Sequence, residues 1–385
     1  MSDSTCRPEI RRSAPRVRIL RLAVAGLALL LAIEPAAAAS FANGMMAART
    51  AQSQRMIVAF QSWAARWGVP NASISVMKGT NLLGTAGVGS YTAGAIEPVA
   101  SESKAITAMC ITQLVEDKKL TYATTLKTVL ADYFKKHKPA DPTVKTITVA
   151  QLLTHSSGIT YDPSQGNQGG LIEQLPHNQT DLGQQAQITF SQPLGTAPGT
   201  SYDYNNMNYA LLGFIIETVT GKAYENYCNT NVLKPVGVTD AKLDPNWRIL
   251  ASFGGWKISA QDYTRFLEYF LPKLNLVSIP VKNWPKFDLG GGAYYSLGTL
   301  MRASSQSKGN NFWHDGSFSW NDGTTNASFG AYFGVLAQDV RYMVEVGPTV
   351  SDDAFGDLDS SLYNAAYNIT NARGPAQKQK RLLPH

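Results

Sequence analysis

Apolar residues recur every three to four positions in several stretches of the chain, and this spacing predicts helices that turn one face into a core. In the clearest stretch, which follows Ser101, the apolar positions are Ile106, Met109, Cys110 and Leu114. Ser101 and Lys104 then lie one turn apart on the same face, at the start of an amphipathic helix. The other segments with helical spacing are 48–67, 120–134, 148–153, 209–219, 223–233, 260–270 and 353–369.

Short runs of β-favouring residues between turn residues predict strands near both ends of the chain. They cover 73–77, 82–87, 296–302, 311–317, 328–336 and 341–346. Strands at both ends with helices between them favour one antiparallel sheet, flanked by the terminal helices and interrupted by a mostly helical insertion. We therefore predict an α+β fold with a sheet subdomain at about 48–100 and 290–372, and a helical subdomain at about 101–289.

The segment 162–198 shows little periodicity and is rich in Gln, Asn, Gly and Pro. Loops of this length in compact domains are commonly functional. We expect this one to form a wall of the functional site.

The first 39 residues have the pattern of an export signal. Five arginines between Arg11 and Arg21 precede an apolar run over 22–33, and small residues follow up to Ala39. Twelve apolar residues are too few to cross a bilayer comfortably, and small residues suit signal peptidase. We expect cleavage near Ala39 and a mature domain over 40–385 in a bacterial periplasm or outside the cell, unless the signal stays as an anchor. The export route is left open.

Composition narrows the choice of partners. The chain has 385 residues, 44% hydrophobic and 16% charged, with a formal net charge of +6, which is typical of an ordered globular protein. The first 39 residues contain six arginines and three acidic residues, so about +3 remains without them. This balance gives no reason to expect nucleic acid as a partner.

Cysteines and histidines offer no metal-binding pattern. Cys6 lies in the predicted signal, whereas Cys110 and Cys228 both fall in predicted helices and are either disulfide-bonded or free. The five histidines form no cluster with ligand spacing. We expect neither a metal nor a cofactor.

Ser101 and Lys104 form a Ser-x-x-Lys motif with a possible catalytic use. A serine hydroxyl is a poor nucleophile at neutral pH, and a lysine one turn away is close enough to take its proton. Backbone N–H groups at a helix start point toward the serine and suit a developing oxyanion. The alternative is a solvated helix start with an N-cap serine, because so short a motif is common.

Three further stretches follow Ser101 in an informative order. They are Thr148 to Gly158, with the sequence TVAQLLTHSSG, Pro198-Gly199-Thr200 with Tyr204-Asn205-Asn206, and Trp313-His314-Asp315-Gly316. Together with Ser-x-x-Lys they resemble the serine β-lactamase and penicillin-recognising family over residues 50–370. The resemblance is to its class C and DD-peptidase-like branch, which also contains esterases and D-amino-acid amidases.

The resemblance implies a role for each matching residue. Ser101 is expected to be the nucleophile, Lys104 its activating partner, and Tyr204 the group that shuttles the proton to the leaving group. The expected substrate-binding residues are Asn206, which would also contact the lysine, His314, Gly316 and Ser317, whose backbone N–H would form an oxyanion hole with that of Ser101. His155 matches a structural turn.

Two departures from the family pattern bear on the substrate. Asp315 stands where the family usually has threonine, and it would repel a substrate carboxylate if it faced the site. Because side chains alternate along a strand, Asp315 is equally able to face away. The family usually has Lys-Thr-Gly in its β-lactamases, and His314 at the basic position argues against that activity.

We therefore expect a secreted serine hydrolase that acts through an acyl-enzyme on an ester or amide bond of a small molecule or peptide. An esterase or a D-amino-acid peptidase or amidase fits best. The alternatives are a β-lactamase or DD-carboxypeptidase acting on β-lactams or peptidoglycan, and a non-catalytic penicillin- or cell-wall-binding sensor. The oligomeric state is left open.

Overall fold

The computed structural model describes residues 50–165, 170–270, 281–323 and 325–370. The predicted signal peptide over 1–39 lies outside them. Within the described part of the chain, no helix is long and apolar enough to span a membrane. The predicted subdomain boundaries stay a prediction.

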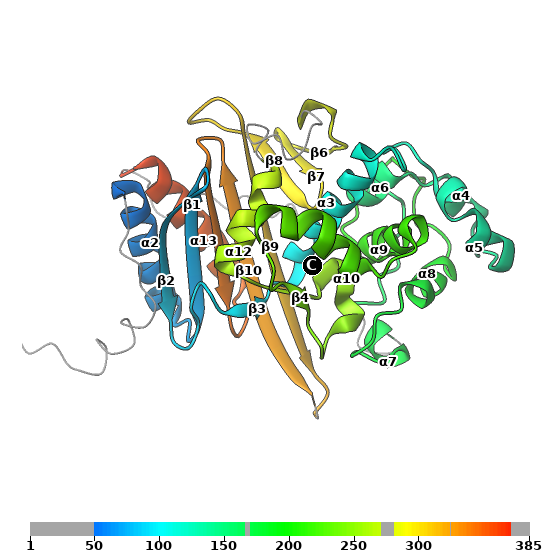
Figure 1. Ribbon diagram of the computed structural model, residues 1–385, viewed down its shortest axis with the longest axis horizontal. Coiled ribbons are helices and arrows are strands. Elements are labelled where there is room, and N and C mark those ends of the chain that lie inside the picture. The colour runs from blue at the N-terminus through cyan, green and yellow to red at the C-terminus, as the bar shows by residue number, and fades with distance from the viewer. Residues whose placement is uncertain (1–49, 166–169, 271–280, 324, 371–385) are drawn as a thin grey trace, which may run out of the picture.

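An antiparallel sheet of eight strands forms the centre of the fold (Figure 1). Its order is β2-β1-β11-β10-β9-β8-β7-β6. The strands are β1 (Ala72–Lys78), β2 (Asn81–Val88), β6 (Phe287–Gly290), β7 (Ala293–Ser296), β8 (Thr299–Ala303), β9 (Asn310–Asn321), β10 (Asn326–Leu336) and β11 (Val340–Val346). The N-terminal hairpin joins the C-terminal strands because β1 pairs with β11, with Ile74 opposite Val344. The predicted α+β fold with a shared sheet is confirmed.

One predicted strand begins later than expected, because β8 starts at Thr299 rather than at Ser296. The segment 296–302 is interrupted by a turn at Leu297 and Gly298, both at positive φ, which separates β7 from β8. A Cβ on Gly298 would lie 2.6 Å from the backbone carbon of Lys104. The turn therefore packs directly against the segment that carries Ser101 and Lys104, and this close approach requires glycine.

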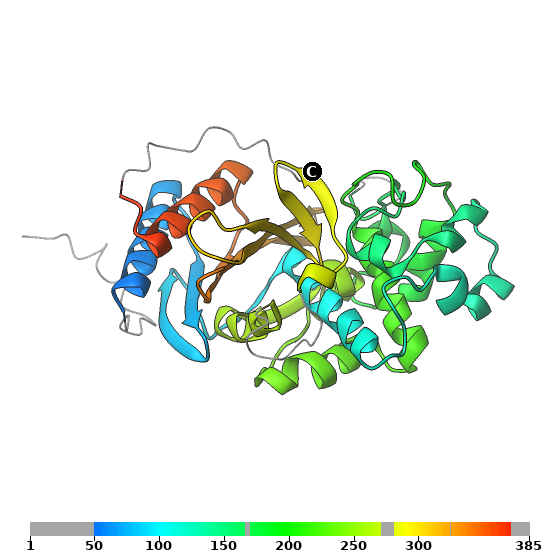
Figure 2. The same ribbon diagram turned by 90° about the horizontal axis from the view of Figure 1, so that it is seen from above.

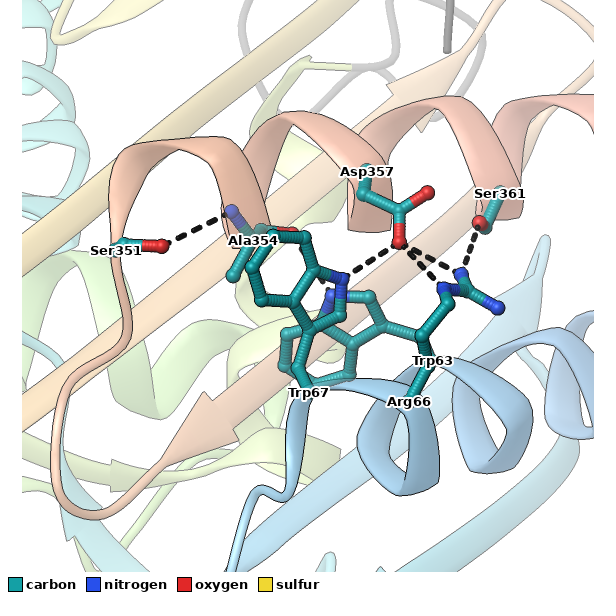
Figure 3. A network of polar contacts seen from close by, with 7 residues as sticks. All are labelled: Trp63, Arg66, Trp67, Ser351, Ala354, Asp357 and Ser361. Atoms are coloured by element: carbon teal, nitrogen blue, oxygen red, sulfur yellow. Dashed lines mark hydrogen bonds and ion pairs between the residues drawn. The ribbon is translucent and has the colours of Figure 1, made fainter. Parts of the chain in front are cut away.

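The two terminal helices, α2 (Ala51–Trp67) and α13 (Asp352–Tyr367), cover one face of the sheet, as seen from above in Figure 2. Figure 3 shows their polar contacts: Trp63 Nε1 donates to the Ala354 carbonyl at 2.8 Å, and Asp357 accepts from Arg66 and Trp67. Apolar side chains of both helices pack with β1 and β11 in one core cluster. The site must therefore lie on the other face.

The other face of the sheet carries the central helix α3 (Ser103–Glu116). Its predicted amphipathic pattern is wrong, because its residues from Ser103 to Thr112 are all buried. The remaining α-helices are α4 (Leu126–Val129), α5 (Ala131–Lys136), α6 (Val149–Leu153), α7 (Leu171–Gln174), α8 (Leu182–Phe190), α9 (Asn206–Thr220), α10 (Tyr224–Cys228), α11 (Ala251–Gly254) and α12 (Ala260–Phe266). Helices α9, α10 and α11 and the turn at Gly298 lie against α3, which explains its burial on several sides.

Long-range contacts tie these helices to the centre. Cys110 of α3 and Cys228 of α10 form a disulfide, with their Cα atoms 5.5 Å apart. A small three-stranded sheet, in the order β3-β5-β4, lies beside the segment that leads into Ser101. Its strands are β3 (Ile96–Pro98), β4 (Lys242–Leu243) and β5 (Trp256–Ser259).

The segment 162–198 differs from the loop expected there. It contains α7 and the nine-residue helix α8, which begins after Asp181, whose side chain accepts from the Gln184 N–H. The helical spacing of apolar residues is interrupted in α8 by polar Gln185. This side chain is nevertheless fully buried and donates to the Ile249 carbonyl at 2.8 Å. A buried, hydrogen-bonded glutamine fills a position that hydrophobicity would miss.

Candidate active site

Ser101 lies in a single 3₁₀ turn, Ala100–Glu102, that leads into α3. No side chain caps this turn, so the reading of Ser101 as an N-cap serine is wrong. Ala100 has φ +47, and Ser101 is half-buried next to the fully buried Lys104. Such a backbone conformation is uncommon for alanine and is often found at functional sites.

The amine of Lys104 is held against the serine. Its Nζ donates to Ser101 Oγ at 3.0 Å and to the Phe253 carbonyl of α11 at 2.8 Å. Burial lowers the pKa of Lys104 to about 7, against the opposing effects of Asp162 and Glu102. A substantial fraction of this amine is therefore neutral near pH 7 and able to accept the serine proton.

Tyr204 lies beside both groups. Its side chain is hydrogen-bonded to Ser101, and Lys104 Nζ lies 4.9 Å from the centre of its ring. Burial raises the pKa of the Tyr204 phenol well above its ordinary value, and the Ser101 hydrogen bond only partly opposes this. The phenol is therefore protonated at neutral pH, so it is able to donate a proton.

His155 positions the segment that carries Tyr204. It has φ +53, and its Nδ1 accepts from the backbone N–H of Asn205 at 3.1 Å. Its ring centre lies 4.4 Å from that of Tyr204, and its carbonyl accepts from the Asp203 N–H at 2.8 Å. Burial lowers the pKa of His155 well below its ordinary value, so the ring is neutral. These contacts agree with the structural turn that the resemblance implied.

Asn206 has different partners from those the resemblance implies. Its Nδ2 donates to Ser164 Oγ at 2.8 Å, and its backbone N–H donates to Asp162 Oδ2 at 2.8 Å. Its Oδ1 is buried and has no hydrogen-bond partner in the described part of the chain. The expected contact with Lys104 is absent from the hydrogen bonds of that amine, which go to Ser101 and Phe253.

His314 lies on the site face of β9 and is fully buried. The Tyr295 hydroxyl of β7 is 3.2 Å from its Nε2, and the centre of its ring is 6.0 Å from that of Tyr204. Burial and the charge of Lys104 lower the pKa of His314 to about 3. The ring is therefore uncharged in the working range and supplies no cation to a substrate carboxylate.

Gly316 brings β9 directly over the nucleophile. A Cβ at this position would lie 2.1 Å from Glu102 Oε2 and 2.6 Å from the Ser101 nitrogen. No other residue fits here without moving the strand away from Ser101. Ser317 follows on the exposed side of the strand, with its hydroxyl accepting from Thr349 Oγ1 at 2.9 Å.

One edge of β9 is open beside Ser101. Strand β8 pairs with β9 only over Asn310 to Trp313, whereas β10 accompanies β9 to Asn321. From His314 onward, the other edge has no strand partner among the described residues. An open edge of this kind is able to align an extended substrate next to the nucleophile.

The alternation along β9 settles the orientation of Asp315. His314 and Gly316 face Ser101, so the intervening Asp315 lies on the opposite face, where it pairs with Tyr332 of β10. The Tyr332 hydroxyl donates to Asp359 of α13. Of the two orientations open from sequence, Asp315 takes the one directed away from the site, toward α13.

We therefore expect Asp315→Asn to leave substrate selection unchanged. The ratio of kcat/KM for a neutral ester to that for a carboxylate-bearing analogue should change less than about twofold, because strand alternation directs this carboxylate away from the bound substrate. Steady-state kinetics on the matched pair measures the ratio. A several-fold rise for the carboxylate-bearing substrate would contradict the orientation.

Two groups at the site, the Phe253 carbonyl and the Tyr295 side chain, were not predicted from the sequence. The Phe253 carbonyl holds Lys104 Nζ, and Tyr295 contacts His314 and His155. A backbone carbonyl has no residue-type signature, and Tyr295 reads as one more β-favouring residue of a strand. Only the burial of both beside Lys104 and His314 reveals their place.

No group of three or more His, Cys, Asp or Glu side chains able to hold a metal occurs in the described ranges 50–165, 170–270, 281–323 and 325–370. The site itself offers a hydroxyl, an amine, a phenol and backbone N–H donors.

Comparison with known proteins places this geometry in context. A family model described as Beta-lactamase matches residues 60–340. A protein of Escherichia coli (strain K12) named "Putative D-alanyl-D-alanine carboxypeptidase" is 32% identical over 120 residues, which is 30% of this chain and 26% of that protein. This chain thus matches about a quarter of the length of that relative.

Solved structures share the fold. The octameric penicillin-binding protein homologue from Pyrococcus abyssi has a TM-score of 0.63 at 21% identity, covering 82% of this chain and 76% of that one. The D-amino acid amidase from Ochrobactrum anthropi has a TM-score of 0.63 at 16% identity, covering 83% and 99%. At these identities the likeness concerns the fold.

Proposed function

The chain belongs to the beta-lactamase family of serine hydrolases, and from this premise we propose that it cleaves an ester or amide bond through an acyl-enzyme on Ser101. The observation that carries the proposal is the hydrogen bond of 3.0 Å between Lys104 Nζ and Ser101 Oγ, made by a buried amine whose pKa is lowered to about 7. This geometry matches a nucleophile with its base.

The proposed reaction has two steps. Ser101 Oγ attacks the carbonyl carbon while its proton passes to Lys104, and the backbone N–H groups of Ser101 and Ser317 bind the oxyanion. The bond to the leaving group then breaks, and the leaving group takes a proton from the Tyr204 phenol, which Lys104 reprotonates. Water attacks the acyl-enzyme by the reverse sequence of proton transfers and releases the acid.

For the substrate, we propose a neutral ester or a D-amino-acid amide or peptide. Support comes from the uncharged, buried His314, which leaves this strand without a cation for a carboxylate. Further support comes from the structural likeness to a protein named as a D-amino acid amidase. A β-lactamase or DD-carboxypeptidase is the second candidate, favoured by the name of the Escherichia coli relative.

For the compartment, we propose the periplasm or the outside of a bacterial cell. The disulfide between Cys110 and Cys228 supports this proposal, because disulfides persist in oxidising compartments. The basic and apolar pattern of residues 1–39 supports it too.

A substrate panel tests the proposed function. We expect turnover of short-chain nitrophenyl esters or D-amino-acid amides, with the L-amides and nitrocefin at least about tenfold slower in kcat/KM, a difference of about 1.4 kcal/mol in transition-state binding. Preferred turnover of nitrocefin or a D-alanyl dipeptide would instead establish the second candidate. A burst of chromophore without a steady rate would indicate a sensor that is acylated but does not turn over.

A further inference from the structure

Glu102 is a carboxylic acid in an unusual place, the first of the two positions between Ser101 and Lys104. Ser-x-x-Lys chemistry uses the serine and the lysine and requires no acid between them. Glu102 is nevertheless fully buried, and neither carboxyl oxygen has a hydrogen-bond partner from another residue in the described part of the chain. Such a group needs an explanation, because an unpaired buried polar atom costs stability.

The carboxyl group of Glu102 points toward the oxyanion donors. A Cβ on Gly316 would lie 2.1 Å from Glu102 Oε2 and 2.6 Å from the Ser101 nitrogen. Both atoms therefore lie against the same point of β9, on the site side of the strand, so the carboxyl group and the Ser101 N–H are close neighbours. The next residue of this strand, Ser317, carries the other proposed oxyanion donor.

The side-chain hydrogen bonds around Glu102 go to groups other than its carboxyl oxygens. Lys104 directs its amine to Ser101 and to the Phe253 carbonyl, and the Tyr263 hydroxyl donates to the backbone carbonyl of Glu102 at 2.8 Å. Four charged or titratable groups interact electrostatically with Glu102: Asp315 of β9, Lys104 of α3, Tyr263 of α12, and Tyr204, which precedes α9.

Burial without a partner keeps this carboxyl group protonated near neutrality. Burial first, and the charge of Asp315 second, raise the pKa of Glu102 well above its ordinary value, whereas a hydrogen bond from its own backbone and the charge of Lys104 oppose this rise. Glu102, next to Ser101, is therefore still a neutral acid in the pH range above about 7, in which most of Lys104 has lost its proton.

We propose that Glu102 is a positioning residue that keeps the space beneath the oxyanion donors uncharged, and that its ionisation at alkaline pH stops the reaction by placing a negative charge beside the developing oxyanion. The inference rests on the proposed acyl-enzyme function for its kinetic consequence. In this proposal, ionisation of Glu102 causes the loss of activity at alkaline pH, whereas protonation of Lys104 causes the loss of activity at acid pH.

The pH profile of kcat/KM tests the assignment. The wild type should rise through a pH of about 7 as Lys104 loses its proton and fall at alkaline pH by at least about tenfold as Glu102 ionises. Glu102→Gln, which is neutral at every pH and of equal size, should keep the acid limb and lose the alkaline fall. Glu102→Met provides a second neutral variant if the amide disturbs folding.

Glu345→Gln is the matched control. Glu345 is an equally buried carboxyl group on β11, where it accepts from Ser73 Oγ at 2.7 Å, and burial raises its pKa as well. This variant should keep both limbs of the profile. An unchanged alkaline fall in both Glu102 variants would overturn the proposal.

Infrared spectroscopy tests the protonation of Glu102 without any substrate. At pH 7 the wild type and Glu345→Gln should show a carbonyl-stretch band of a protonated carboxyl group that Glu102→Gln and Glu102→Met lack. If the wild type turns over no substrate, the proposed function fails and this band alone decides the state of Glu102. Absence of the difference band would overturn the proposal.

Discussion

Replacing Ser101 with alanine is expected to lower kcat by at least about 10⁴-fold, the largest loss of any single substitution in this chain. The Ser101 hydroxyl oxygen is the atom that forms the bond to the acyl group in the proposed mechanism, and it lies next to Lys104 Nζ and Gly316. The fold should persist, because the hydroxyl caps no helix and its removal is expected to cost less than about 1 kcal/mol of unfolding free energy.

Intact-mass spectra measure the expected loss directly. The wild type should gain one adduct from a fluorophosphonate, and Ser101→Ala should gain none while keeping its melting temperature within a few degrees of the wild type. Ser319→Ala is a suitable control, because this serine is exposed farther along β9, and it should label as the wild type does. Persistent labelling of Ser101→Ala would show that another residue is the nucleophile.

Lys104→Met and Tyr204→Phe are expected to lower kcat by about 10²-fold or more each and to combine less than additively. Both groups serve the same proton transfers, since Lys104 contacts Ser101 at 3.0 Å and Tyr204 is hydrogen-bonded to the same serine. Once one member is removed, the other has less to contribute. Methionine keeps most of the length of the buried side chain and removes the amine.

The pH profile separates the two roles. Lys104 must be neutral to accept a proton, so wild-type kcat/KM should rise as pH increases through about 7, the lowered pKa of this amine. Tyr204→Phe should keep this limb, whereas Lys104→Met should lose it. Additive losses in the double variant, or an acid limb that survives in Lys104→Met, would mean that the two residues do not act together as a base and its relay.

The local pattern of the sequence was sufficient for the architecture. Runs of β-favouring residues in 73–77 and 341–346 predicted strands, and these became the paired β1 and β11 of the sheet. The order of Ser101, Tyr204 and His314 along the chain predicted the residues that the fold brings together. Such patterns are legible because periodicity and motif spacing are local properties of the chain.

The contacts of residues whose partners lie far away in the sequence could not be predicted in the same way. Asn206 was expected to contact Lys104, but the loop segment at Asp162 and Ser164 supplies its partners. The glutamine-rich segment around α8 was predicted as a loop, because the buried Gln185, which donates to the Ile249 carbonyl, is a polar residue and does not add to an apolar helical pattern. The pairing of Cys110 with Cys228 likewise depended on how α3 meets α10.

Sequence by itself therefore determined the fold class and the order of the site residues along the chain, and it predicted Ser101 as the nucleophile with Lys104 as its base, since these rest on periodicity and motifs that are readable within short stretches. Tertiary structure decided the ionisation and direction of the groups around them. Burial on every side of α3 lowers the pKa of Lys104 and leaves the carboxyl oxygens of Glu102 without a hydrogen-bond partner from another residue in the described part of the chain. The pleat of β9 turns Asp315 away from the site. Burial and strand facing are set by neighbours from distant segments, and those neighbours exist only once the chain has folded.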